Sequence, residues 1–179
     1  MGFSFGGILF RNGRSVQDDT IRDMLKLNDP DGTSTTTMEE AISHEFNDVG
    51  MARTDDFLIV IGHNIPFSLS FEGEDKLTGV DRALMTLSEK GDIIGVLSDS
   101  VSATYTYSIF SKGKRIRVSK TAGGKLVYES GKPTGYERDM DNGSNRLMKL
   151  IENFTGHNYS ELVFDLGLKV QVYKLKKNY

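Results

Sequence analysis

The sequence contains no cysteine and no tryptophan, and only three prolines and three histidines among its 179 residues. A chain without cysteine forms no disulfide, zinc ribbon, iron–sulfur centre or thiolate nucleophile. Histidines and carboxylates are then the side chains that could bind a metal. The lack of cysteine is also typical of proteins that work in a reducing compartment.

Long apolar segments are missing as well. No run approaches the roughly 18 apolar residues that a membrane-spanning helix requires. The first ten residues have neither the basic start nor the small-residue cleavage site of a secretory signal. The formal net charge of −3 gives no overall attraction to nucleic acids or to acidic membranes. We therefore expect a soluble cytoplasmic protein that contacts no membrane, and nucleic acid is a disfavoured partner.

The composition is that of an ordinary globular protein, with 37% apolar and 26% charged residues. A chain of this length normally forms one hydrophobic core. The sequence shows no repeat, no proline-rich linker and no shift in composition that would divide it. We expect residues 1–179 to form a single globular domain.

Strands are predicted where apolar and polar residues alternate, or where a short run is apolar throughout. The segment 57–61 is apolar at every position, which is typical of a central strand covered on both faces. Strict alternation in 67–71 predicts a half-buried strand that could form a hairpin with it. The other predicted strands are 3–10, about four strands of an antiparallel meander between 92 and 130, and one from the segments 162–164 and 168–175.

Helices are predicted from the helical spacing of apolar residues and from capping patterns. Thr37 with Glu40, and Thr78 with Asp81, have the spacing of capping boxes. Gly91 stands where the C-terminal cap of a helix is expected. The predicted helices cover 16–27, 38–47 and 79–90, and a last one begins near Asn142 or Ser144 and ends near Gly156.

The order of these elements lacks the regular alternation of strand and helix that a doubly wound parallel sheet requires. The run of threonines and serine in 33–37 is expected to be a loop. We therefore expect an α+β fold, in which a mostly antiparallel or mixed sheet of about six to eight strands has three or four helices packed against it.

The usual local signatures of cofactor and metal sites fail on spacing. The glycines of residues 2–7 lack the spacing and the lysine of a phosphate-binding loop. The acidic turns 29–32 and 139–143 would place non-acidic residues at the first ligand position of a calcium loop. After His44, Asp48 occupies the position where a zinc protease motif needs its second histidine. We expect no metal and no cofactor.

A catalytic hypothesis arises from the residues that follow two apolar strands. His63 comes directly after the central strand, and Asp99 and Ser100 follow the next apolar strand. If these strands were parallel neighbours, the three side chains would meet at one edge of the sheet and could perform the acid–base or nucleophilic chemistry of a hydrolase. An antiparallel strand at 67–71 would weaken this hypothesis, and no Gly-x-Ser-x-Gly motif supports it.

A second set of candidates lies in the meander, because tyrosine and arginine are favoured at protein interfaces. These candidate binding residues are Tyr105, Tyr107, Arg115 and Arg117. On this interpretation the exposed face of the 103–119 hairpin contacts a protein partner or a second copy of the chain.

The same hairpin is basic, and its cations in 112–120 could instead contact a nucleic-acid backbone beside the tyrosines. Period-two alternation offers a plainer interpretation, in which Ile116 and Val118 face the core. Arg115 and Arg117 then face solvent or acidic residues on the neighbouring strand.

These observations leave the function open. The leading hypothesis is a non-catalytic binding or protein-interaction domain of a bacterial cytoplasmic protein, with an immunity-like or regulatory role. The alternatives are a hydrolase-like enzyme that uses His63 with Asp99 and Ser100, and nucleic-acid binding through the basic hairpin 112–120.

Overall fold

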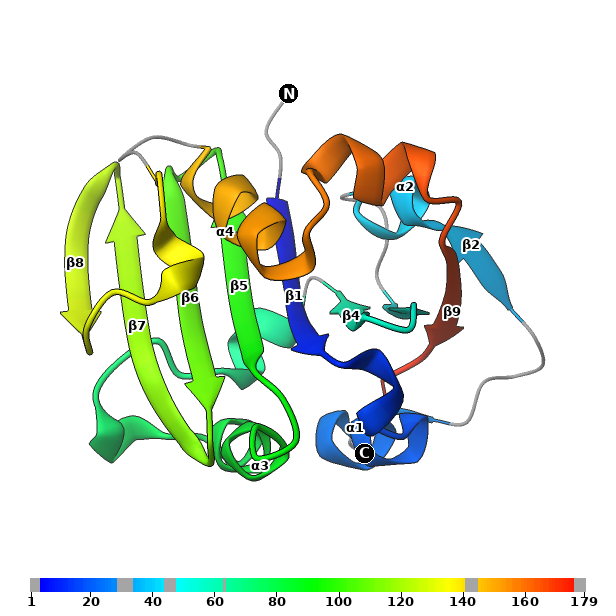
Figure 1. Ribbon diagram of the computed structural model, residues 1–179, viewed down its shortest axis with the longest axis horizontal. Coiled ribbons are helices and arrows are strands. Elements are labelled where there is room, and N and C mark those ends of the chain that lie inside the picture. The colour runs from blue at the N-terminus through cyan, green and yellow to red at the C-terminus, as the bar shows by residue number, and fades with distance from the viewer. Residues whose placement is uncertain (1–3, 29–33, 44–47, 63, 141–144, 176–179) are drawn as a thin grey trace.

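The computed structural model describes residues 4–28, 34–43, 48–62, 64–140 and 145–175. Within these ranges, nine strands form one open, entirely antiparallel sheet in the order β2-β9-β3-β4-β1-β5-β6-β7-β8 (Figure 1). The strands are β1 (Ser4–Arg11), β2 (Thr35–Thr37), β3 (Val49–Arg53), β4 (Phe57–Ile61), β5 (Ile93–Asp99), β6 (Thr104–Ser111), β7 (Lys114–Ala122), β8 (Lys125–Ser130) and β9 (Lys169–Tyr173). The predicted α+β class is confirmed, and the sheet has more strands than expected.

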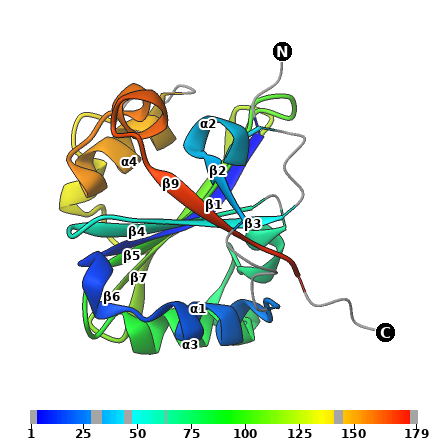
Figure 2. The same cartoon turned by 90° about the vertical axis from the view of Figure 1, so that its right-hand side faces the viewer.

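Helices cover both faces of the sheet (Figure 2). One face carries α1 (Asp18–Leu25) and α3 (Gly79–Leu87), and the other carries α2 (Met38–Ala41) and α4 (Arg146–Thr155). Short helical turns complete the fold: η1 (Gly13–Ser15), η2 (Ile65–Ser68), η3 (Glu74–Lys76), η4 (Gly135–Glu137) and the π-helical η5 (Glu161–Asp165). None of the helices in the described ranges is long and apolar enough to cross a membrane.

The central strand β4 divides the core into two layers. All five of its residues are buried, as the continuous apolar run predicts. Ile59 and Ile61 pack in the layer under α2 and α4, whereas Leu58 and Val60 pack in the layer under α1 and α3. The alternation of side chains along a strand thus places two hydrophobic layers on opposite sides of one sheet.

The predicted strand at 67–71 is wrong. This segment is η2 followed by irregular chain, and β4 pairs with β1 and β3 instead. Its backbone finds side-chain partners in place of a strand, because Ser70 N–H donates to Asp81 over 2.9 Å and the Ser70 carbonyl accepts from Arg115 over 2.7 Å. Leu69 and Phe71 pack in the layer under α1 and α3. The apolar alternation in this segment therefore reflects the burial of its side chains, although the segment does not pair as a strand.

The chain also forms strands that the sequence does not predict. β2 lies in the expected threonine loop and pairs with β9, and β3 has no clear alternation because nearly all its residues are buried. Conversely, the apolar segment 162–164 belongs to the helical turn η5, and the last strand begins only at Lys169. The meander of β5, β6, β7 and β8 is confirmed as four consecutive antiparallel strands.

The predicted first residues of the helices agree better with the structure than the predicted last residues do. The capping boxes at Thr37 and Thr78 are both present. However, α3 ends at Leu87, and Gly91 is not its cap: a Cβ there would lie 2.7 Å from the Arg11 carbonyl, so glycine permits a close backbone approach. Gly156 does end α4 in the left-handed conformation. The second helix ends at Ala41 with Ile42 as its C-terminal cap, so the predicted helix 38–47 is too long. The expected start of the last helix near 142–144 lies outside the described residues.

Candidate interaction site

The strands behind the catalytic hypothesis are not direct neighbours. β4 and β5 both pair with β1, Ile61 opposite Gly7 and Asp99 opposite Ser4. Their C-terminal ends therefore lie at the same end of the sheet with β1 between them, about 10 Å apart across β1 and about 10 Å apart along it at the ordinary strand spacings. His63 lies outside the described residues, so its role with Asp99 and Ser100 stays a prediction.

Asp99 has a clear role in shaping the loop after β5. Its carboxylate accepts the Val101 N–H over 3.0 Å and the Ser102 hydroxyl over 2.7 Å. The hydrogen bond from Ser102, helped by those from the backbone, lowers the pKa of Asp99 against the small cost of burial. A charged aspartate that accepts bonds from its own loop fixes a tight turn. Ser100 is exposed in this turn.

This β5–β6 loop is joined to the β7–β8 turn. Gly123 N–H donates to the Ser102 carbonyl and Gly124 N–H to the Ala103 carbonyl, both over 3.2 Å. Ala103 has a φ of +48°, a conformation that few residues with a side chain adopt. The two glycines have φ of +58° and +72°, as a tight hairpin turn requires. Two turns at one end of the sheet therefore form a single unit.

Three large aliphatic side chains are exposed on this unit, and we call them the apolar corner. They are Val101, Leu126 and Val127, with 81%, 55% and 60% of their surface exposed. Thr121 pairs with Leu126 and Lys120 with Tyr128, so Val127 is the extra residue of a β-bulge. β8 is an outermost strand of the sheet (Figure 1). Its outer edge carries no strand from the described chain.

The four predicted binding residues are not displayed on the surface. Tyr107, Arg115 and Arg117 are buried, and Tyr105 is half-buried. The expected exposure of the three buried side chains is therefore wrong. Tyr105 and Tyr107 pack in the layer under α2 and α4.

A bulge in β7 explains why the arginines are buried. Ile109 pairs with Arg117 and Phe110 with Arg115, which leaves Ile116 as the extra residue. The bulge breaks the alternation, so the two arginines lie on opposite faces of the sheet and Ile116 is 38% exposed. The predicted inward position of Ile116 is wrong, and that of Val118 is confirmed.

Arg117 is the centre of a buried polar network. Its guanidinium donates to Glu137 over 2.8 Å and also pairs with Glu129. The Tyr107 hydroxyl donates to the same Glu137 oxygen over 2.6 Å and accepts from Arg146 over 3.1 Å. These contacts join η4 and α4 to the sheet.

The charges of this network are stabilised by its own members. Burial alone would raise the pKa of Glu137, but hydrogen bonds from Tyr107, the Thr134 backbone and Arg117 outweigh it and lower that pKa. Burial and the contact with Glu137 raise the pKa of Tyr107. Buried ions with matched partners are typical of a structural brace. We therefore assign this network to the fold and not to chemistry.

Arg115 braces the other face of the sheet. Its guanidinium donates to the Ser70 and Glu72 carbonyls, each over 2.7 Å. These bonds hold the irregular segment after η2 against β7. Both arginines of the predicted interface therefore have intramolecular roles.

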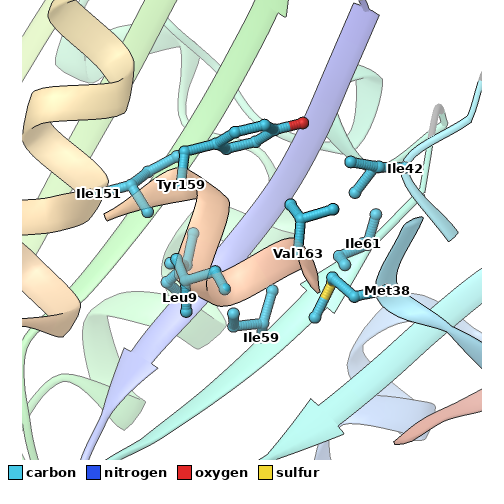
Figure 3. A pocket seen from close by; sticks show the side chains of 9 residues that line it. Leu9, Met38, Ile42, Ile59, Ile61, Ile151, Tyr159 and Val163 are labelled. Carbon is cyan, nitrogen blue, oxygen red and sulfur yellow. The ribbon is translucent and has the colours of Figure 1, made fainter. Parts of the chain in front are cut away.

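An apolar pocket lies between the sheet, α2, α4 and η5 (Figure 3). Its volume is about 20 Å³, which is room for about one water molecule. Tyr159 lies across one side of it, and burial raises the pKa of that phenol. The pocket is lined by Leu9, Met38, Ile42, Ile59, Ile61, Ile151, Tyr159, Leu162 and Val163. It is too small for a ligand in this conformation.

Two polar depressions on the surface are each about 350 Å³ or slightly less. In the first depression Arg53 contacts Asp18, and Asp55 of the second contacts Arg14 of the first. The described residues contain no group of three histidines or carboxylates that could hold a metal ion.

Comparisons with protein-family models, with curated proteins and with solved structures gave no match. The fold and the site define this chain as an α+β protein with a single antiparallel sheet and an exposed apolar corner at one of its edges. Sequence reasoning predicted the strand that carries Leu126 and Val127 but not that it lies at the edge. The adjacent apolar pair, out of phase with strand alternation, was the available signal of a bulge.

Proposed function

We propose that the protein is a non-catalytic protein-interaction module that receives a segment of a partner protein along the edge strand β8. The observation that carries this proposal is the apolar corner, whose three aliphatic side chains are exposed on the edge strand β8 and on the loop joined to its turn. Exposed apolar patches of this kind mark interaction sites in soluble proteins.

Strand addition is the binding mode that fits this edge. An added strand would hydrogen-bond to the outer backbone of β8 and cover the aliphatic side chains. Covering Leu126 and Val127 fully would contribute roughly 1 kcal/mol each. Edge strands that avoid pairing usually carry charges, prolines or few apolar residues. β8 has Lys125 and Glu129, but Leu126 and Val127 between them are apolar and exposed.

Such a role needs no catalytic group, in keeping with the internal use of Asp99, Arg115 and Arg117. On this proposal the protein works in the cytoplasm, where it binds a partner protein in an immunity-like or regulatory role. Asp99 then serves as a positioning residue, because it fixes the turn that presents Val101.

Site-specific photo-crosslinking in the host cell tests this function. A photoreactive phenylalanine analogue placed at Val127 is expected to give one discrete crosslinked protein. The matched control is the same analogue at Phe164, which is 58% exposed against 60% for Val127 and lies on η5. Leu126→Asp should abolish the crosslink from position 127. Equal crosslinking from both positions, or none from 127, would refute the proposed function.

A further inference from the structure

We infer that the segment received by β8 is acidic, an inference that rests on the proposed function and specifies its partner. Residues 112–132 contain seven of the 22 lysines and arginines but only one of the 25 acidic residues. This segment therefore carries a charge of +6, and the remainder of the chain carries −9. The edge of the sheet is the cationic part of an acidic protein.

Part of this positive charge is used inside the fold. Arg117 is paired with Glu129 and Glu137, and Lys120 with Glu72 at 3.6 Å. Arg115 has two backbone carbonyls as its partners, so its charge is held by dipoles and not by a carboxylate.

The other four cations are exposed and make no ion pair with any residue in the described ranges. They are Lys112, Lys114, Lys125 and Lys132. Lys125 begins β8, and Lys132 follows its end by two residues. Lys112 and Lys114 lie at the turn where β7 begins, beyond Val118, the last residue of β7 with which β8 pairs. Cations therefore flank both ends of the strand.

Three carboxylates near β7 and β8 are already engaged. Glu72 accepts Lys76 over 2.6 Å as well as Lys120, and Glu129 and Glu137 share Arg117. A carboxylate placed beside Lys125 or Lys132 would thus gain a cation that the protein itself does not pair. Exposed pairs of this type each contribute little to affinity, and they favour encounter at low salt.

An acidic peptide fits this edge better than a nucleic acid does. Single-stranded nucleic acids need exposed aromatic rings for base stacking. Tyr107 is buried, and Tyr105 and Tyr128 are half-buried against the two core layers. The aliphatic side chains of the corner require apolar partners, which a sugar–phosphate backbone does not supply. The fitting ligand has apolar residues in its centre and carboxylates toward its ends.

The length of β8 defines the length of this ligand. Six residues of strand span about 20 Å. An extended peptide of similar length would reach from Lys125 to the neighbourhood of Lys132. Its alternate side chains would face Leu126 and Val127.

Selection from a random-peptide display library on the purified protein tests the inference. We expect the enriched peptides to carry net negative charge and apolar β-branched residues. Binding of a selected peptide, measured by fluorescence anisotropy, should weaken with salt. The Lys125→Glu/Lys132→Glu double variant should lose about three- to tenfold in affinity.

The matched control is Lys169→Glu, an exposed lysine of β9 far from this edge, which should leave the affinity unchanged. Folding of each variant is checked by its unfolding transition. If the enriched peptides were neutral or basic and their binding were lost on Leu126→Asp, the inference of an acidic partner segment would be overturned while the proposed function stands. No enrichment, or tighter binding of a single-stranded oligonucleotide than of any peptide, would overturn it as well, and the crosslink from Val127 then decides the proposed function separately.

Discussion

At the scale of single residues, buried charges decide how the helices attach to the sheet. Arg117 and Glu137 are both almost fully buried, and Tyr107 and Arg146 complete their hydrogen bonds. A buried pair of this kind stabilises little by itself, but removal of one partner leaves the other charge without compensation. The network therefore makes the position of η4 sensitive to a single carboxylate.

Glu137→Gln is predicted to destabilise the protein by about 3 kcal/mol, because Arg117 would lose its buried carboxylate and keep only Glu129, whose side chain is 38% exposed. Urea unfolding followed by circular dichroism measures this loss. Glu152→Gln is the control, because that carboxylate pairs only with Lys149 at the surface. Equal stabilities of the two variants would contradict the structural role of the network.

The same residue predicts a pH dependence. The pKa of Glu137 is lowered in the folded state from its ordinary value of 4.5. Its contribution to stability is therefore complete above that value and is lost as the pH falls through the lowered folded pKa. The free energy of unfolding of the wild type should fall more steeply in this acidic range than that of Glu137→Gln. Parallel pH profiles of the two proteins would contradict the assignment.

At the scale of elements, one aspartate holds a helix and an irregular segment together. Asp81 is fully buried at the start of α3, where its carboxylate accepts N–H groups from Thr78 over 2.8 Å and from Ser70 over 2.9 Å. The first bond caps the helix. The second gives the Ser70 N–H a partner in place of the hydrogen bond to a neighbouring strand that a strand at 67–71 would have made. The capping box was predictable from spacing, whereas the bond to Ser70 was not, because it joins segments 11 residues apart.

Asp81→Ala should destabilise the protein by about 2 kcal/mol, since it removes a helix cap and leaves the half-buried Ser70 N–H without this partner. Hydrogen exchange should speed up at the amides of Ser70 and Thr78. Asp23→Ala, an exposed aspartate near the end of α1, serves as the control and should change stability by less than about 0.5 kcal/mol. Unchanged exchange at Ser70 would show that this amide has another partner.

At the scale of the whole molecule, helices cover the middle of the sheet on both faces, whereas its β8 edge is exposed. β4 is buried at every residue, whereas β8 is exposed at all but one. Exposed strands with few apolar neighbours open more readily than buried ones. A site for strand addition is expected in this less protected part of the fold.

Native-state hydrogen exchange is expected to show this gradient directly. Amides of β1 and β4 should exchange only through global unfolding, and those of β8 through local opening at a much lower free energy. Measurements by NMR across mild denaturant concentrations separate the two processes. If β8 were protected as strongly as β4, its edge would have to be covered in solution, and the open edge would be contradicted.

The sequence by itself determined the class of fold, the central strand, the meander and both capping boxes, because each depends on residues close together in the chain. Local periodicity could not decide the strand order, the irregular course of 67–71 or the burial of Arg115 and Arg117. Two bulges, at Ile116 and Val127, each shift the alternation of side chains by one residue. Such a shift moves an arginine that was expected to face solvent into the core, and an aliphatic side chain that was expected in the core to the surface. Only the tertiary structure showed that β8 is an edge strand, because pairing between distant strands is fixed by packing and not by the residues of the strand alone. The candidate interaction site depends on that outcome: an apolar pair that a central strand would bury is left exposed on the edge.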